Sequence, residues 1–181
     1  KQKIYPLSEL VSELANDIFE GTPRILNELV NRNKISGTAV SARKKLLEAM
    51  LDYSDEEDLG ITGFPPEKSM YISCLKNTKL HIFEDETWQW SLKKVSSQLK
   101  QLFEFTDSIL KDSAGTKINI ASIETLWNQA PYGVSTGVFP ILFFAYLKTL
   151  GQDIAYYEKA MSGDFEFITE PDTDYIHKLQ K

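Results

Sequence analysis

Apolar and polar residues in the second half of the chain follow a pattern that predicts a strand, two helices and a hairpin. Residues 117–120 alternate as a short strand does, and apolar residues recur at helical spacing over residues 120–127. A break at Pro131 separates this helix from a second, more apolar one over residues 138–150. Residues 153–169 then alternate on either side of a Ser-Gly-Asp turn, which predicts a hairpin.

This order of elements is that of a winged-helix domain with a small β-hairpin as its wing. The domain is predicted over residues 84–181, and it begins with a long helix at residues 88–113, where apolar residues recur at steps of four and three. A last amphipathic helix follows Pro171. The apolar helix at residues 138–150 carries one charge, Lys148, whereas a helix that reads DNA needs side chains for phosphates and bases. We therefore expect that helix to pack inside the protein.

The first half of the chain reads as a set of short amphipathic helices. Residues 7–18 place their apolar side chains on one helical face. Thr22 and Pro23 are typical of the start of a second helix, as N-cap and first helical residue. A third helix is expected to start near Thr38, and a fourth at Pro65.

The stretch that most resembles a linker is residues 81–86, which end in a run of acidic residues. We therefore predict a mainly α protein of two domains. An N-terminal helical bundle covers residues 1–83, and the winged-helix domain with its hairpin wing covers residues 84–181.

Several stretches resemble the winged-helix region of large bacterial P-loop ATPases from phage-defence islands, such as those associated with BREX systems. They are Trp-Asn-Gln-Ala-Pro-Tyr-Gly-Val at residues 127–134, Gly-Val-Phe-Pro at 137–140, Ile-Ala-Tyr-Tyr-Glu at 154–158, residues 27–32 with Ser36 and Arg43, and residues 60–65. The resemblance implies a regulatory or scaffolding piece of a longer protein. The phosphate-binding motif Gly-x-x-x-x-Gly-Lys-Ser/Thr does not occur in this sequence.

Composition narrows the classes of function. The chain has 181 residues, 42% of them hydrophobic, which is enough to build a packed core. Its net charge of −6 argues against a surface built throughout for nucleic acid or an anionic membrane. The single cysteine, Cys74, suits a reducing compartment, and no apolar run reaches the roughly eighteen residues of a membrane span. We expect a cytoplasmic protein, and the start at Lys1 in place of Met suggests a piece of a longer chain.

No motif in the sequence predicts catalysis, a metal or a cofactor. The pair Gly60 and Gly63 lacks the preceding strand and third glycine of a phosphate loop. The acidic run at residues 55–58 lacks the alternating ligand spacing of a calcium loop, so a solvated loop is expected. A zinc site needs more Cys and His ligands than this sequence provides close together. Cys74 lies on an apolar helix face, where a buried and unreactive thiol is the ordinary outcome.

Two groups of residues are candidate contact sites. Basic residues concentrate just before the third predicted helix and on its first two turns, and they form either an ordinary solvated face or a contact for nucleic acid or an acidic partner; they are Arg32, Lys34, Arg43, Lys44 and Lys45. The apolar helix is expected to leave an interaction surface exposed around Phe139, Phe143 and Tyr146.

Three hypotheses of function follow. The favoured one is a non-catalytic module that mediates assembly or regulation within a large phage-defence-type ATPase, with the rest of that chain or another protein as partner. The alternative is a winged-helix nucleic-acid-binding domain that uses the basic residues at 32–45. The third is an enzyme whose catalytic residues are distant in the sequence and come together only when the chain folds. This hypothesis requires a deep pocket with converging titratable groups.

Overall fold

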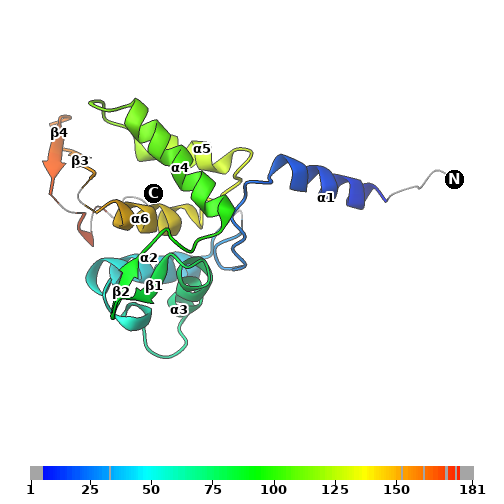
Figure 1. Cartoon of the computed structure of the whole chain (residues 1–181), viewed down its shortest axis with the longest axis horizontal. Coiled ribbons are helices and arrows are strands. Elements are labelled where there is room, and N and C mark those ends of the chain that lie inside the picture. Colours follow the sequence, from blue (N-terminus) through cyan, green and yellow to red (C-terminus); the bar gives the residue numbers. More distant parts are fainter. Residues whose placement is uncertain are drawn as a thin grey trace.

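The computed structural model describes residues 6–32, 34–151, 153–160, 162–169, 171–173 and 175, and these residues form a mainly α-helical protein with two small antiparallel hairpins (Figure 1). The elements are α1 (Leu7–Ile18), α2 (Gly37–Asp52), the short turn η1 (Glu57–Gly60), α3 (Pro66–Tyr71), the π-helical turn η2 (Ile72–Lys76), β1 (His81–Glu84), β2 (Thr87–Trp90), α4 (Ser97–Asp112), α5 (Ile120–Asn128), α6 (Phe139–Leu150), β3 (Tyr156–Lys159) and β4 (Phe165–Ile168).

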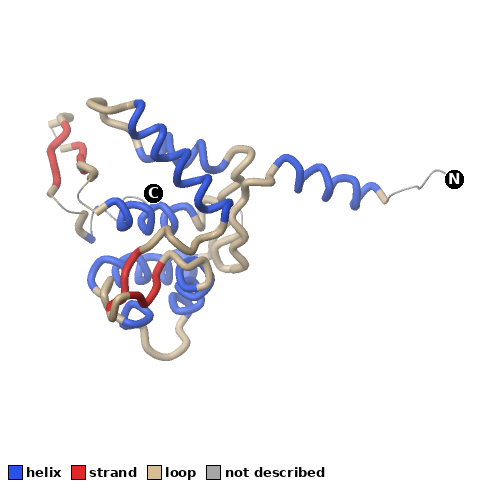
Figure 2. Tube along the Cα trace, in the orientation of Figure 1, coloured by secondary structure: helices blue, strands red, loops and turns tan. Residues whose placement is uncertain are grey.

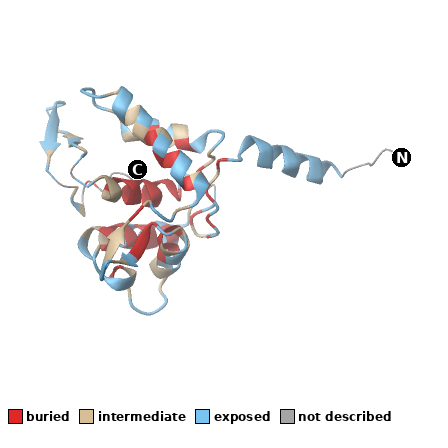
Figure 3. Ribbon diagram, viewed as in Figure 1, coloured by how far each residue is buried: buried red, intermediate tan, exposed pale blue. Residues whose placement is uncertain are grey.

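Helix α6 is the centre of the hydrophobic core. Its residues from Phe139 to Leu147 are all buried, and Figure 3 shows it enclosed between two groups of elements. On one side α4 and α5 contribute Phe103 and Trp127, whose rings lie 5.1 Å from Tyr146 and 5.2 Å from Phe139. On the other side α6 contacts α2, η2 and β2. One continuous core therefore joins the two halves of the chain.

Side-chain caps set the starts of three helices. Ser36 accepts a hydrogen bond from the backbone N–H of Ala39 at the start of α2, and Ser96 accepts one from Leu99 at the start of α4. At the start of α5 the side chain of Asn119 does the same. Each bond satisfies a backbone donor that has no partner within its helix.

Most of the predicted helices are confirmed. The structure has helices at residues 7–18, from Gly37 near the predicted third start, and after Pro65. In the second half, α5 and α6 match the two predicted helices closely. The hairpin is also present, because β3 pairs with β4 in an antiparallel register.

Two predicted helices are wrong. Residues 22–27 have no regular secondary structure instead of a helix, and this segment places Ile25 and Asn27 in the interior. The leading helix does not begin at residue 88, because Thr87–Trp90 form β2 and the helix starts only at Ser97. The steps of four and three that predicted the helix include Trp88 as their first residue. Trp88 and Trp90 are also two residues apart, which places them on one face of a strand, so the spacing alone did not distinguish the two structures.

The predicted domain boundary is wrong for the same reason. β1 pairs with β2 in the register His81 to Trp90 and Glu84 to Thr87, so a boundary after residue 83 cuts a hairpin. The 81–86 stretch is therefore part of the fold and not a linker. Residues 117–119 precede α5 without forming the predicted strand, and the predicted last helix lies mostly outside the described residues.

Candidate interaction surface

Helix α1 projects away from the rest of the chain (Figures 1 and 2), and none of its residues is buried. Its apolar stripe remains open to solvent, with exposed fractions of 47–77% for Leu7, Leu10, Val11, Leu14 and Ile18. The remainder of the helix is polar and includes three acidic residues, Glu9, Glu13 and Asp17, but no Lys or Arg. An apolar stripe of this kind ordinarily packs against another element. No described residue of this chain covers it.

The base of α1 is held by close packing. Gly133 has a positive φ of 56°, and a Cβ at this position would lie 2.7 Å from the ring of Phe19 and 3.3 Å from Thr22 Oγ1. Gly21 approaches the same turn, since a Cβ there would lie 3.2 Å from the carbonyl oxygen of Pro131. Glycine at both positions lets the chain leave α1 directly against the turn that follows α5.

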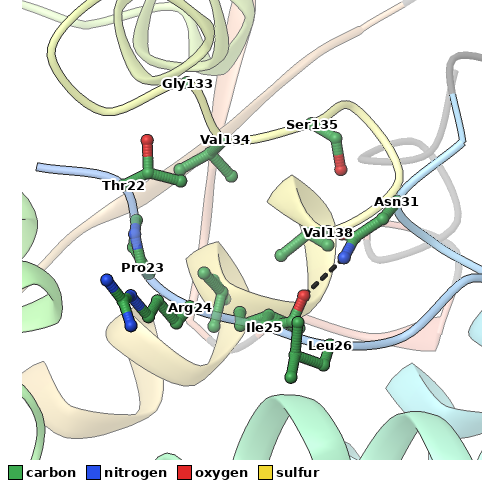
Figure 4. A pocket seen from close by; sticks show the side chains of 11 residues that line it. Thr22, Pro23, Arg24, Ile25, Leu26, Asn31, Gly133, Val134, Ser135 and Val138 are labelled. Atoms are coloured by element: carbon green, nitrogen blue, oxygen red, sulfur yellow. Dashed lines mark hydrogen bonds between the residues drawn. The ribbon is translucent and has the colours of Figure 1, made fainter. Parts of the chain in front are cut away.

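A shallow groove lies next to this base and is shown in Figure 4. Its volume is about 290 Å³, and its walls are mostly apolar, including Ile25, Val134 and Leu142. Asn31 donates a hydrogen bond to the carbonyl of Ile25 across one side. The hydroxyl of Thr22 is buried and has no hydrogen-bond partner among the described residues. The groove can accept an apolar side chain, but it does not gather the titratable groups that catalysis requires.

The structure disperses the five predicted basic residues. Arg32 pairs with Glu28 at 3.3 Å on the surface, and Lys45 lies 3.8 Å from Glu67. Lys34 and Lys44 are exposed. Both carboxylates reduce the positive charge available to a phosphate, and the exposed pair of Arg32 with Glu28 contributes little to stability.

Arg43 is wrong as a surface contact, because only 4% of it is exposed. Its Nη1 donates to the carbonyl oxygens of Thr136 and Gly137, at 3.1 and 3.2 Å. Burial lowers the pKa of Arg43, and the charge of Glu124 offsets part of that effect. The guanidinium therefore joins α2 to the start of α6 and is unavailable to a partner.

The predicted apolar surface is also absent. Phe139 and Tyr146 are fully buried, and Phe143 is 3% exposed. The rings of Phe139 and Phe143 stack at 5.1 Å, and Tyr146 donates to the carboxylate of Asp107 at 2.5 Å. These side chains contact α4 and α5. The spacing of apolar residues within α6 does not reveal that these two helices cover it. The exposed apolar stripe is on α1 instead.

A buried polar cluster joins η1, α3 and β1. The hydroxyl of Tyr71 lies 2.9 Å from Nδ1 of His81, and the other ring nitrogen of His81 lies 2.9 Å from the carbonyl oxygen of Ser54. The ring of His81 also stacks on Trp88 at 5.1 Å and contacts Trp90 in a tilted arrangement at 4.8 Å. Burial lowers the pKa of His81, which favours the neutral ring. Burial and Asp58 raise the pKa of Tyr71 well above its usual range.

Asp58 connects this cluster to two lysines. Its carboxylate lies 2.7 Å from both Lys68 Nζ and Lys76 Nζ. Burial raises the pKa of Asp58, but the two lysines outweigh that effect and hold the pKa below its usual value. Asp58, Leu59 and Gly60 all have positive φ. The lysines therefore hold a turn of strained backbone in place.

The described residues contain no group of His, Cys, Asp and Glu arranged to hold a metal ion. Among them there is also no helix long and apolar enough to span a membrane. Cys74 is fully buried, and burial raises the pKa of its thiol to about 12. A thiol of that kind is unreactive near neutral pH.

No family model, curated protein or solved structure matches this chain. The sequence predicted α1 as an amphipathic helix, but the spacing that reveals an apolar stripe does not reveal what covers it. The acidic residues and the absence of Lys and Arg within residues 7–18 were the available signal for the character of its surface.

Proposed function

We propose that this chain is a non-catalytic interaction module, and that helix α1 docks on another protein chain within a larger assembly. The observation that supports it is the continuous apolar stripe of α1, which stays exposed, whereas the apolar helix α6 is buried from Phe139 to Leu147. An isolated helix of 12 residues is marginal in water. Coverage of the stripe by a partner supplies the stability that the helix lacks alone.

The resemblance to large phage-defence ATPases supports a role in assembly or regulation within such a protein. The order α5, α6 and the β3–β4 hairpin supports a relation to winged-helix domains. Because α6 is buried from Phe139 to Leu147, this winged helix would act as a structural element and not as a reader of DNA.

The nucleic-acid alternative has weaker support. Arg43 is used inside the protein, and Arg32 and Lys45 lie near carboxylates. Replacing Arg43, Lys44 and Lys45 together would damage the fold as well as the surface, so loss of binding in that variant would be ambiguous. A Lys34→Ala and Lys44→Ala variant tests the surface charge alone, and salt-dependent DNA binding that this variant loses would favour the alternative.

The docking role is tested by photo-crosslinking in cells. A photoreactive residue replaces Val11 in the apolar stripe, and the control replaces Asn16, which is exposed on the same helix but outside the stripe. We expect a covalent adduct with one defined protein from position 11 and not from position 16. The adduct must form again when the two purified proteins are mixed. No adduct at either position, or equal adducts at both, would contradict the proposed function.

A further inference from the structure

We propose that the partner of α1 is the α1 helix of a second copy of this chain, and that the two helices pair in parallel as a short two-stranded coiled coil. This inference rests on the proposed function, because it names the protein that covers the stripe. It commits to one occupant and one orientation, which makes it testable at single residues.

The residues of the stripe have the spacing of a coiled-coil seam. Leu7, Val11, Leu14 and Ile18 follow one another at steps of four, three and four, and all four side chains are at least half exposed. In heptad terms the leucines occupy d positions, and the β-branched Val11 and Ile18 occupy a positions. β-branched residues at a with leucine at d favour two parallel strands over other assemblies. The pattern therefore fits a copy of itself.

The flanks of the seam are complementary as well. Leu10 occupies a g position and is 47% exposed. In a parallel pair a g residue lies against the e residue five positions later on the other helix, which is Ala15 here. A leucine over an alanine extends the apolar contact without a clash. The other e position holds Ser8, and the second g position holds Asp17, so one flanking position of the helix carries a charge.

The charges of α1 distinguish a second copy of the helix from other kinds of partner. Glu9, Glu13 and Asp17 lie outside the a and d positions, and the helix contains no basic residue. An anionic membrane or nucleic acid would be repelled by this helix. Two copies of α1 also repel each other weakly, so added salt should strengthen their association by screening. A basic partner would show the opposite dependence on salt.

The length of the helix sets the strength of the pair. Twelve residues extend over about 18 Å. The stripe alone buries less than the roughly 1,200 Å² of a standard stable interface. We therefore expect a weak dimer, with a dissociation constant in roughly the micromolar to millimolar range. Tethering within a larger assembly would raise the effective concentration of the two helices.

The test uses a disulfide at the seam of the full chain. Leu14→Cys places a thiol at a d position, where it meets its own copy in a parallel pair, whereas Glu13→Cys places one on the outer face. The native Cys74 is buried and does not compete. Under oxidised glutathione we expect a covalent dimer of the Leu14→Cys protein, no dimer of the Glu13→Cys protein, and a higher yield as salt increases.

Sedimentation of the reduced protein gives the second measurement. Wild type should self-associate at high concentration, and Leu14→Glu should weaken this by about a hundredfold, with Glu13→Gln as the matched control. A monomer at concentrations up to about the millimolar range, a dimer whose Leu14→Cys variant forms no disulfide, or equal crosslinking at both positions overturns the inference. If position 11 captures a different protein while Leu14→Cys stays monomeric, the proposed function stands and the self-pairing fails.

Discussion

The indole N–H of Trp127 donates to the hydroxyl of Thr106 at 2.9 Å, and both side chains are fully buried. Thr106 in turn donates to the carbonyl of Leu102, one turn earlier in α4. The threonine thus accepts from α5 while it is anchored to its own helix. This bond therefore joins α5 to α4 in the interior of the protein.

Thr106→Val is expected to lower the free energy of unfolding by about 1–3 kcal/mol. Valine has a similar shape but leaves the buried indole N–H of Trp127 without a partner. Thr125→Val is the matched control, because its hydroxyl bonds only to its own helix at an exposed position. Urea titration measures both. Equal effects of the two substitutions would show that the Trp127 bond contributes nothing specific.

Gly137→Ala is expected to destabilise the fold by about 3 kcal/mol. A Cβ there would overlap the carbonyl oxygen of Val30 and lie 2.7 Å from Ile35 Cδ1. Val30 belongs to the segment that leads into α2, so the backbone would have to move. At Gly37 nothing lies within 4 Å of an added Cβ, and Gly37→Ala should leave the melting temperature unchanged or higher. A neutral Gly137→Ala protein would contradict this packing.

Asp58→Asn is expected to destabilise the protein at pH 7 and to have a smaller effect in acid. The two lysines hold the pKa of Asp58 below its usual value of 3.8, so the folded state favours the ionised carboxylate. That contribution is complete above about pH 4 and is lost as the pH falls through the lower pKa of the folded state. Asparagine tolerates the positive φ of this position. Denaturant midpoints at pH 7 and pH 3 give the comparison, and a pH-independent difference would contradict it.

His81 should also contribute to stability in a pH-dependent way. Burial holds its pKa below the usual 6.5, so the unfolded chain takes up a proton at a higher pH than the folded one. The contribution is present above pH 6.5 and declines as the pH falls below that value. His81→Gln should lower stability at pH 7 and flatten the decline toward pH 5. A wild type as stable at pH 5 as at pH 7 would show that His81 is protonated without cost.

The sequence predicted best those elements whose signals are local. Helix α1 was read from the spacing of its leucines, and α6 from a run of apolar residues between a proline and Gly151. The helix predicted from residue 88 failed, because the pairing of Trp88 with Phe83 involves another strand. Periodicity within one segment carries no information about that partner.

The candidate site was harder to predict because exposure depends on distant parts of the chain. Arg43 looked like part of a basic surface, yet its partners are carbonyl groups more than ninety residues later. Phe139 and Tyr146 are covered by Trp127 and Phe103 from two other helices. The stripe on α1 was visible in the sequence, but its exposure follows only from the absence of such a neighbour among the described residues.

The enclosure of α6 constrains how this protein can change during evolution. Residues before 84 and after 96 pack against the same helix, from opposite sides. A crossover that exchanged one half for that of a distant relative would bring together surfaces that had not been selected to fit. We therefore expect the two halves to be inherited as a unit, whereas α1, none of whose residues is buried, is free of that constraint.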